Sequence, residues 1–373
     1  MLSTKKTRVA VLLGGRSNEK EISLETGRNV VYKLSPHKYE ALALFVNNDM
    51  NLFHINQQQL VLNSTKEIEK SLLPEQQILW NNLATFTDFV FIGLHGGQGE
   101  NGCVQGALEM LDIPYNGSSI LSSALCMNKY KTNELLSAKG FHVPQSLLIA
   151  KEEWQNNQDE VINQIKQKFA LPFIIKPFDD GCSVYVSKIT HHGEIPAALN
   201  SFFLTGKSHA FLEEYIVGME LTVGVIGNTQ AKALTPSQAV ASQGILSIEE
   251  KFLPGAGENQ TPAPLPEVTL NFVKQVMEDV YKTVDCKGYA RIDCFYQSAQ
   301  QSRTKQERVV ILEINTLPAL TPATCIFHQA AEENIRPMDF IDMIITLGLE
   351  EHKKNILLDN DLQEKNNETQ KTV

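Results

Sequence analysis

Apolar strands alternate with amphipathic helices over the first part of the chain. Residues 8–13 are rich in aliphatic side chains and are followed by a pair of glycines, and residues 21–34 then place apolar side chains at helical spacing. Two more runs, at 39–46 and 88–94, have the composition of buried strands. Because a strand, a glycine turn and a helix open a doubly wound unit, the pattern predicts an α/β fold with a parallel sheet. The glycines do not spell G-x-G-x-x-G, so a dinucleotide site is not supported.

A glycine-rich stretch follows the strand at 88–94, with four glycines among the seven residues from Gly96 to Gly102. Such a backbone can approach a ligand closely. It also lies past the carboxyl end of a strand, where open α/β sheets bind their ligands. We therefore expect His95 to be a site residue rather than a packed one. Glu19, in the loop after the first strand, could face the same ligand or could simply be solvated.

The middle of the chain presents a lysine at the end of a buried strand. The pattern predicts one helix at 127–139, with Lys129 near its start, and a second at 151–169. A strand at 171–177 then ends near Lys176 and leads into a turn of small residues. An ammonium group and the backbone N–H groups of such a turn can converge on a phosphate. No helix follows, so this is not the usual phosphate-binding loop, and an ordinary hairpin remains the alternative.

The stretch from Gly288 to Leu320 carries the most chemistry. We interpret it as two strands joined by a long polar turn, with Asp293 in the first strand and Glu313 and Asn315 on one face of the second. Two carboxylates and an amide are costly to bury without partners. A hard divalent cation would satisfy all three through oxygen, and Mg2+ usually arrives with phosphates. The alternative is a pair of edge strands with one face in water.

Composition narrows the classes of function. A length of 373 residues favours two or three domains. The formal net charge is 33 − 43 = −10, which argues against nucleic acid or an anionic membrane as partner. The six cysteines form no C-x-x-C pair, and no apolar run reaches signal-peptide or membrane-spanning length. We therefore expect a soluble cytoplasmic protein. Towards the end of the chain, the pattern predicts helices at 267–284, 321–331 and 337–347 and a polar tail from residue 350.

Taken together, the motifs resemble the D-alanine–D-alanine ligases of the ATP-grasp superfamily, up to about Gly348. The segments that carry the resemblance, in order, are LLGGRSNEKEISL, LHGGQGENGCVQGALEMLDIPYNG, MNKYKT, IIKPFDDGCSVYVSK, EEYIVGMELTVG, PAPLP, GYARIDCFY and LEINTLPALTPAT. The resemblance implies an α/β, ATP-grasp fold, with an N-terminal doubly wound parallel sheet and two α+β subdomains that clasp ATP. We expect the domains at 1–122, 123–216 and 217–349, followed by a polar tail at 350–373.

The resemblance also implies a reaction. ATP would phosphorylate the carboxylate of a first D-alanine, and the amine of a second would attack the acyl phosphate. ADP, phosphate and a D,D-dipeptide for peptidoglycan would leave. Phosphorylation is needed because oxide is a poor leaving group, and cations stabilise the charge that develops. The resemblance implies ATP as co-substrate, two Mg2+ (or Mn2+) ions as cofactors and a homodimer built through the first domain.

The resemblance gives roles to individual residues. The residues implied to hold the nucleotide are Lys129 and Lys176 at the phosphates, Glu213 and Ile216 at the adenine and Glu220 at the ribose. Asp293, Glu313 and Asn315 would be the metal ligands, and Arg291 would stabilise the transferring phosphoryl group and the tetrahedral intermediate. Glu19 would bind the ammonium of the first amino acid, with His95 near its carboxylate. Lys251 would belong to a loop that closes over the site and keeps water out.

Five positions depart from the usual family pattern. Cys182 stands where a serine is usual, Phe252 for tyrosine, Tyr185 and Ala319 for glycine, and Thr324 for the serine that would bind the second carboxylate. A thiol is a weak donor and phenylalanine has none, so the usual Glu–Ser–Tyr bonding near the substrates cannot form. The second substrate therefore stays open between D-alanine and D-lactate, D-serine or another amino acid. A non-catalytic nucleotide-binding paralogue is a further alternative.

Overall fold

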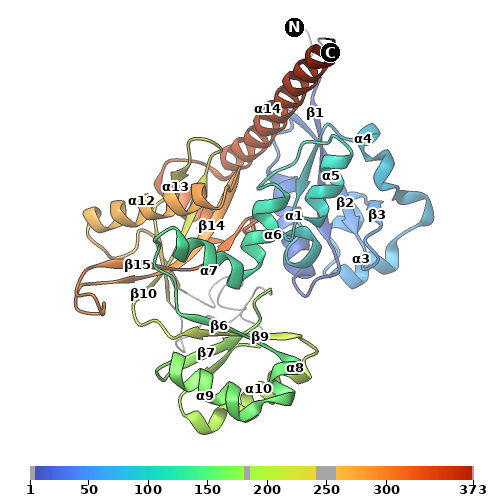
Figure 1. Ribbon diagram of the computed structural model, residues 1–373. Helices are drawn as coiled ribbons and strands as arrows, with labels where there is room; N and C mark the ends of the chain where they lie inside the picture. Colours follow the sequence, from blue (N-terminus) through green and yellow to red (C-terminus); the bar gives the residue numbers. More distant parts are fainter. Residues whose placement is uncertain (1–4, 180–184, 241–257, 372–373) are drawn as a thin grey trace.

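The structure is a computed structural model that describes residues 5–179, 185–240 and 258–371. It contains three sheets, each with its own helices (Figure 1). The first sheet has the order β4-β3-β2-β1-β5, and β1 pairs in parallel with both β2 and β5. The parallel sheet predicted for the start of the chain is therefore confirmed for β2, β1 and β5, whereas β3 and β4 join it in antiparallel fashion. Its strands are β1 (Thr7–Gly14), β2 (Tyr39–Val46), β3 (Leu52–His54), β4 (Gln77–Ile78) and β5 (Phe89–Ile92).

The helices of this first unit include α1, which connects β1 to β2 and packs against β1. The helices are α1 (Lys20–Lys33), α2 (Gln57–Leu60), α3 (Thr65–Ser71), α4 (Leu83–Phe86) and α5 (Cys103–Met110). Two further helices, α6 (Ile120–Met127) and α7 (Lys129–Ala138), lead from this unit to the next. Asn128 begins α7 by accepting a hydrogen bond from the backbone N–H of Lys131 at 3.0 Å, as a helix N-cap does.

The second sheet is antiparallel and has helices packed on one face. Its order is β6-β9-β7-β8, from strands β6 (Ser146–Ala150), β7 (Phe173–Lys176), β8 (Ser187–Ile189) and β9 (His209–Glu214). Apolar side chains of the sheet pack with those of α8 (Lys151–Asn156), α9 (Gln158–Lys168) and α10 (Ile195–Leu204). The single helix predicted at 151–169 is wrong. Asn157, at φ −138° and ψ 48°, leaves helical geometry and separates α8 from α9.

The third sheet has one apolar face and one face on which polar and apolar side chains are mixed. Its strands are β10 (Met219–Ile226), β11 (Lys232–Ala233), β12 (Ser237–Val240), β13 (Glu258–Gln260), β14 (Tyr289–Gln297) and β15 (Arg308–Asn315). On one face, alternate residues such as Val223, Ile292 and Ile311 pack against α12 (Glu267–Thr283). The opposite face is therefore left for the side chains in between, which include Arg291 and Asp293.

A β-bulge adjusts this alternation in β15. Asp293 pairs with Glu313, but the next residue, Cys294, pairs with Ile311, so Leu312 is the extra residue. The bulge lets Ile311 join the apolar core while Glu313 stays on the face of Asp293. Bulges that re-aim a side chain in this way are common beside active sites. The predicted pair of strands with a polar connection is confirmed, and its polar residues share one face.

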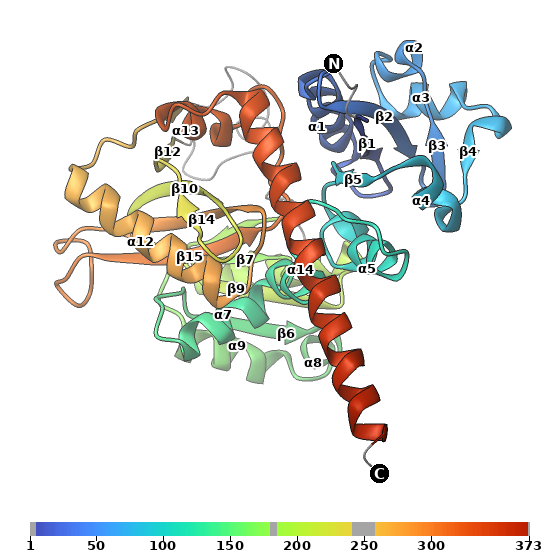
Figure 2. The same ribbon diagram turned by 90° about the horizontal axis from the view of Figure 1, so that it is seen from above.

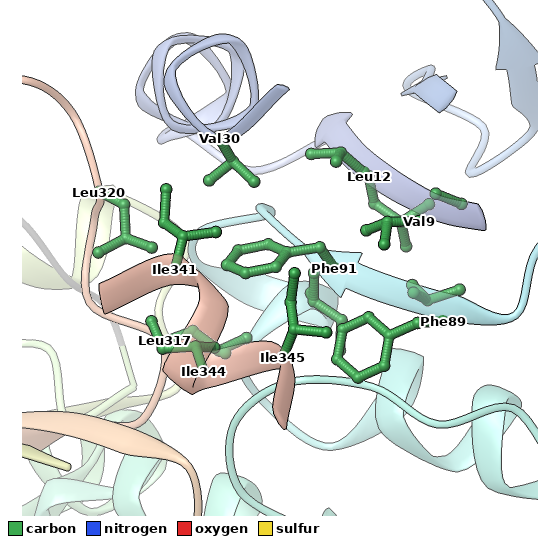
Figure 3. Close-up of a cluster of buried hydrophobic side chains, with 14 of the residues drawn as sticks. Val9, Leu12, Val30, Phe89, Phe91, Leu317, Leu320, Ile341, Ile344 and Ile345 are labelled. Atoms are coloured by element: carbon green, nitrogen blue, oxygen red, sulfur yellow. The ribbon is translucent and has the colours of Figure 1, made fainter. Parts of the chain in front are cut away.

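The C-terminal helices pack against the hydrophobic core of the first sheet, although they are far from it in the sequence. Helix α13 (Cys325–Glu332) leads to α14 (Pro337–Lys371), which lies against the first sheet (Figure 2). The apolar residues that meet there include Val9, Leu12, Val30, Phe89, Phe91, Leu317, Leu320, Ile341, Ile344 and Ile345 (Figure 3). The prediction that the last helix ends at residue 347 is wrong. Gly348 continues α14, and a Cβ there would lie 2.3 Å from the carbonyl oxygen of Tyr115.

Within the described part of the chain, no helix combines the length and the apolar character needed to cross a membrane.

Candidate active site

Asp293 is the centre of a buried polar cluster on the third sheet. Its carboxylate accepts a bidentate pair of bonds from Arg291, from Nε to Oδ1 at 2.9 Å and from Nη2 to Oδ2 at 2.8 Å. Thr222 on β10 donates to Oδ1 at 2.6 Å, and Asn315 on β15 donates to Oδ2 at 3.5 Å. Burial opposes the charge of Arg291, but Asp293 raises its pKa above the ordinary value. The cluster thus joins side chains from three adjacent strands.

Lys129 reaches this cluster from the first residue of α7. Its Nζ lies 3.2 Å from Oε2 of Glu313, and the residue is only 8% exposed. Burial lowers the pKa of Lys129, but the carboxylates of Glu313, Glu213 and Glu19 outweigh it, so the net shift is upward. The backbone N–H of Lys129 donates to the carbonyl of Phe178 at 3.0 Å, which ties α7 to the segment after β7. The three carboxylates come from three different parts of the fold, and Lys129 lies among them.

Lys176 and Glu213 form a second ion pair, on the second sheet. Lys176 ends β7, and its Nζ donates to Oε1 of Glu213 on β9 at 2.8 Å. The ammonium also lies 5.7 Å from the ring centroid of Phe211. Within the described residues, the other oxygen of Glu213, Oε2, is buried without a hydrogen-bond partner. A buried acceptor of this kind is costly unless a ligand donates to it. Ile216, also buried, follows shortly after β9.

Glu19 lies against the glycine-rich loop of the first unit. It is the N-cap of α1, and its Oε2 would lie 2.7 Å from a Cβ at Gly96. Gly96 has φ +66°, a backbone conformation that residues other than glycine rarely adopt. Glycine is therefore required here both by the backbone and by the close approach of Glu19. The carboxylate of Glu19 therefore packs directly against the backbone of the glycine-rich loop.

His95 is packed in the interior. Its Nε2 lies 2.7 Å from Oγ1 of Thr26, and its Nδ1 lies 3.1 Å from the carbonyl oxygen of Leu317. Ser23 donates to neither ring nitrogen but accepts a bond from the backbone N–H of His95 at 2.8 Å. Burial lowers the pKa of His95 to about 4, so the ring is neutral at neutral pH. Both ring nitrogens are engaged by protein atoms here, and a contact with a substrate carboxylate stays a prediction.

The remaining predicted residues lie around the same polar face or outside the described residues. Glu220 is on β10, two residues before Thr222 on the same face. Thr324 is the N-cap of α13, and Gln329 of that helix bonds to the backbone of β10 at 2.7 and 2.8 Å. Ala319 is buried in the segment after β15. The predicted residues that lie outside the described residues are Cys182, Lys251 and Phe252.

The sequence reasoning missed Glu100 and Thr222. A cavity of about 30 Å³ is lined by Glu100, Lys129, Glu313 and Asn315, among others. Glu100 was visible in the sequence as the one acidic residue inside the glycine-rich stretch. Thr222 alternates with Glu220 along an apolar strand, which is the same signal that pointed to Glu313 and Asn315.

The donor set on β14 and β15 suits a magnesium ion. Asp293 and Glu313 are directly opposite in the antiparallel register, where side chains lie about 5 Å apart. Within the described part of the chain, no group of three or more His, Cys, Asp or Glu side chains is arranged to hold a metal. Magnesium commonly takes only one or two carboxylates and completes its shell with phosphate and water oxygens. Two carboxylates and the amide oxygen of Asn315 fit that pattern.

These features define the class of protein. Two antiparallel sheets present lysines and carboxylates around Lys129, beside a unit with a parallel sheet, and this arrangement is that of an ATP-grasp enzyme. Two family patterns, described as D-ala D-ala ligase N-terminus and D-ala D-ala ligase C-terminus, match residues 8–118 and 135–346. The chain belongs to the D-alanine–D-alanine ligase family.

Individual relatives agree with this assignment. A D-alanine–D-alanine ligase of Pelotomaculum thermopropionicum is 31% identical over 345 residues, which cover 92% of this chain and 97% of the relative. The crystal structure of D-alanine–D-alanine ligase from Bacillus anthracis in complex with ATP has a TM-score of 0.70 at 27% identity, covering 94% of this chain and 99% of that one. The Coxiella burnetii D-alanine–D-alanine ligase shares the fold with a TM-score of 0.80 at 24% identity, covering 98% and 100%.

Proposed function

We propose that this chain joins two D-alanines in an ATP-dependent reaction through an acyl phosphate, releasing ADP and phosphate and supplying a peptidoglycan precursor. The observation that carries the proposal is the position of Lys129. It lies among carboxylates from the first unit and from both antiparallel sheets, beside the Asp293–Arg291 pair. A triphosphate that binds with magnesium requires such a meeting of cations and oxygen ligands.

The nucleotide is assigned to the space between the two antiparallel sheets. Lys129 and Lys176 would hold its phosphates. The buried Oε2 of Glu213 would accept a bond from the adenine amino group, with Ile216 beside the ring and Glu220 at the ribose. The unpartnered Glu213 oxygen supports this placement, because a donor is needed there.

The metal and the reacting groups are assigned to the polar face of β14 and β15. Asp293, Glu313 and Asn315 would hold two magnesium ions, which neutralise phosphate charge when bound. Arg291 would face the transferring phosphoryl group, since its planar fork suits oxyanions. Lys251, which lies outside the described residues, is assigned to the loop that closes over the site and excludes water, and Cys182, also outside them, is assigned to the turn next to Lys176.

The two amino acids are assigned to the region between the first unit and α13. Glu19 would bind the ammonium of the first D-alanine, and His95 would lie near its carboxylate. Ala319 and Thr324 would meet the second D-alanine, with Thr324 at the N-terminus of α13, where a carboxylate is favoured.

The organisation of the protein is part of the same proposal. Domains at 1–122, 123–216 and 217–349 follow the three sheets, with a tail at 350–373. A cytoplasmic location agrees with the free cysteines among the described residues, five in number. A homodimer would appear in analytical ultracentrifugation as twice the chain mass of 41.6 kDa.

The experiment is product analysis with the purified chain, ATP and Mg2+. D-alanine alone should release ADP and give the mass of a D-alanyl-D-alanine dipeptide, whereas L-alanine should not. A second series adds D-lactate or D-serine to D-alanine over a range of pH. Full turnover with D-alanine alone at every pH supports the proposal. The positions Ala319 and Thr324, which differ from the usual family residues, keep one alternative open, a ligase with another second substrate. If the share of the mixed product increases as pH falls, that alternative is established. If no acceptor supports ADP release, nucleotide binding without catalysis is the function that remains.

A further inference from the structure

Glu100 lies in the glycine-rich loop of the first unit, directly after Gly99. Its Oε2 accepts a hydrogen bond from the backbone N–H of Gly96 at 2.7 Å. Glu19 lies against the same glycine, with its Oε2 2.7 Å from the position of a Cβ at Gly96. The two carboxylates therefore lie close to the same residue, one from the N-cap of α1 and one from the glycine-rich loop itself. The charge of Glu19 acts directly on the carboxyl group of Glu100, so the two groups are close to each other.

Glu100 also faces the cavity that holds the metal and phosphate residues. Lys129, Glu313 and Asn315 line that cavity with it. Among the described residues, the cations Arg291 and Lys129 act on Glu100. Each is already engaged, because Arg291 forms its bidentate pair with Asp293 and Lys129 pairs with Glu313.

Burial and the negative charge of Glu19 raise the pKa of Glu100 well above its ordinary range. The carboxyl group of Glu100 thus lies close to a second carboxylate, that of Glu19, at a cavity that Lys129 and Glu313 also line. A ligand that brings a compact cation would stabilise Glu100 in its ionised form. The ammonium of an amino acid is such a cation, and its three N–H groups can serve two carboxylates at once.

We propose that Glu100 binds the ammonium of the first D-alanine jointly with Glu19, so that the first substrate is held between two carboxylates. The inference rests on the proposed ligase function and adds a binding residue to it. A two-carboxylate site accepts an amino acid and rejects a hydroxy acid, because a hydroxyl brings no positive charge to the two carboxylates. The first position is therefore restricted to amino acids, whatever the second position accepts.

The test is the substitution Glu100→Gln, which keeps the shape and removes the charge. Initial rates of ADP release are measured against D-alanine at saturating ATP and fitted with separate KM values for the two amino-acid sites. We expect the KM of the first site to rise about 10- to 100-fold, as loss of a charged hydrogen bond does, with kcat changed less than about threefold. The KM for ATP and the activation constant for Mg2+ should not change. Glu100→Asp should lie between the wild type and Glu100→Gln.

The control is Glu109→Gln, an exposed acid of the neighbouring helix α5 that bonds to Tyr115 at 2.7 Å. It should leave both KM values unchanged. If the first-site KM of Glu100→Gln is unchanged, the inference is overturned. It is also overturned if the activation constant for Mg2+ changes while the first-site KM does not. If Glu100→Gln does not fold, Glu100→Asp decides by the same criterion. A wild-type chain that forms no dipeptide overturns the proposed function, whereas an active wild type with an indifferent Glu100 overturns only this inference.

Discussion

The substitution Glu313→Gln separates the chemistry of the site from its contribution to stability. Glu313 lies 3.2 Å from the ammonium of Lys129, and the two side chains are 21% and 9% exposed. Removal of one partner from a buried ion pair costs up to about 3–5 kcal/mol. Glutamine keeps an oxygen acceptor, and Lys129 is also attracted by Glu213 and Glu19. We therefore expect a loss of about 1–3 kcal/mol in the free energy of unfolding.

The effect on activity should be much larger than this stability loss implies. Loss of a carboxylate charge from the proposed metal site should reduce ADP production at least about 100-fold. Glu333→Gln is the matched control, because Glu333 is 17% exposed and is paired with Lys232 at 2.9 Å and Lys274 at 2.6 Å, away from the site. Its stability loss should be similar, about 1–3 kcal/mol, with ADP production retained.

The assays are urea unfolding followed by circular dichroism and a coupled measurement of ADP release under identical conditions. Retained turnover in Glu313→Gln would refute the assignment of Glu313 to the metal. An equal loss of turnover in Glu333→Gln would show that instability, rather than charge at the site, explains the effect.

Three further outcomes follow from other contacts. Burial lowers the pKa of His95 to about 4 from near 6.5, so the unfolded state binds more protons between these values and stability falls as pH falls through this window. At pH 5 the loss against pH 7 should be about 2 kcal/mol, and urea unfolding of His95→Gln should show this slope reduced. Lys176→Met leaves the carboxylate of Glu213 without its cation and should raise the KM for ATP at least about 10-fold; an unchanged KM would remove Lys176 from the phosphates. Gly96→Ala brings a Cβ to 2.7 Å from Oε2 of Glu19 and should raise the KM for D-alanine, while normal kinetics would show that Glu19 can move freely.

Much of the architecture could be predicted because the apolar periodicity is strong. The parallel unit and the late pair of strands are where the sequence places them, since buried strands have little freedom of composition. Local rules failed where one residue or a distant contact decided the outcome. Asn157 breaks a pattern that otherwise continues as one helix, and Gly348 looks like a helix end but passes closely beside Tyr115. Neither effect is visible from spacing alone.

The residues of the candidate site could be predicted from the sequence, but the ion pairs that they form with one another could not. The sequence places Lys129, Glu313 and Asp293 in separate elements and gives no sign that Lys129 pairs with Glu313 while Asp293 pairs with Arg291. Such partners are chosen by the packing of whole sheets and helices. Glu100 was missed for a different reason. The glycines of its loop predict that the backbone approaches a ligand, and they do not indicate a role for the one acidic side chain among them.

The packing of α14 on the first sheet determines when that sheet can be completed during synthesis. Phe340, Ile341, Ile344 and Ile345 are buried in the same core as β1 and β5, more than 240 residues away from them in the sequence. Their burial contributes of order 10 kcal/mol, comparable to the whole stability of a typical domain. A ribosome must therefore release nearly the entire polypeptide before its earliest strands acquire their final cover. A chain cut short ahead of α14 would expose that apolar surface to chaperones and proteases.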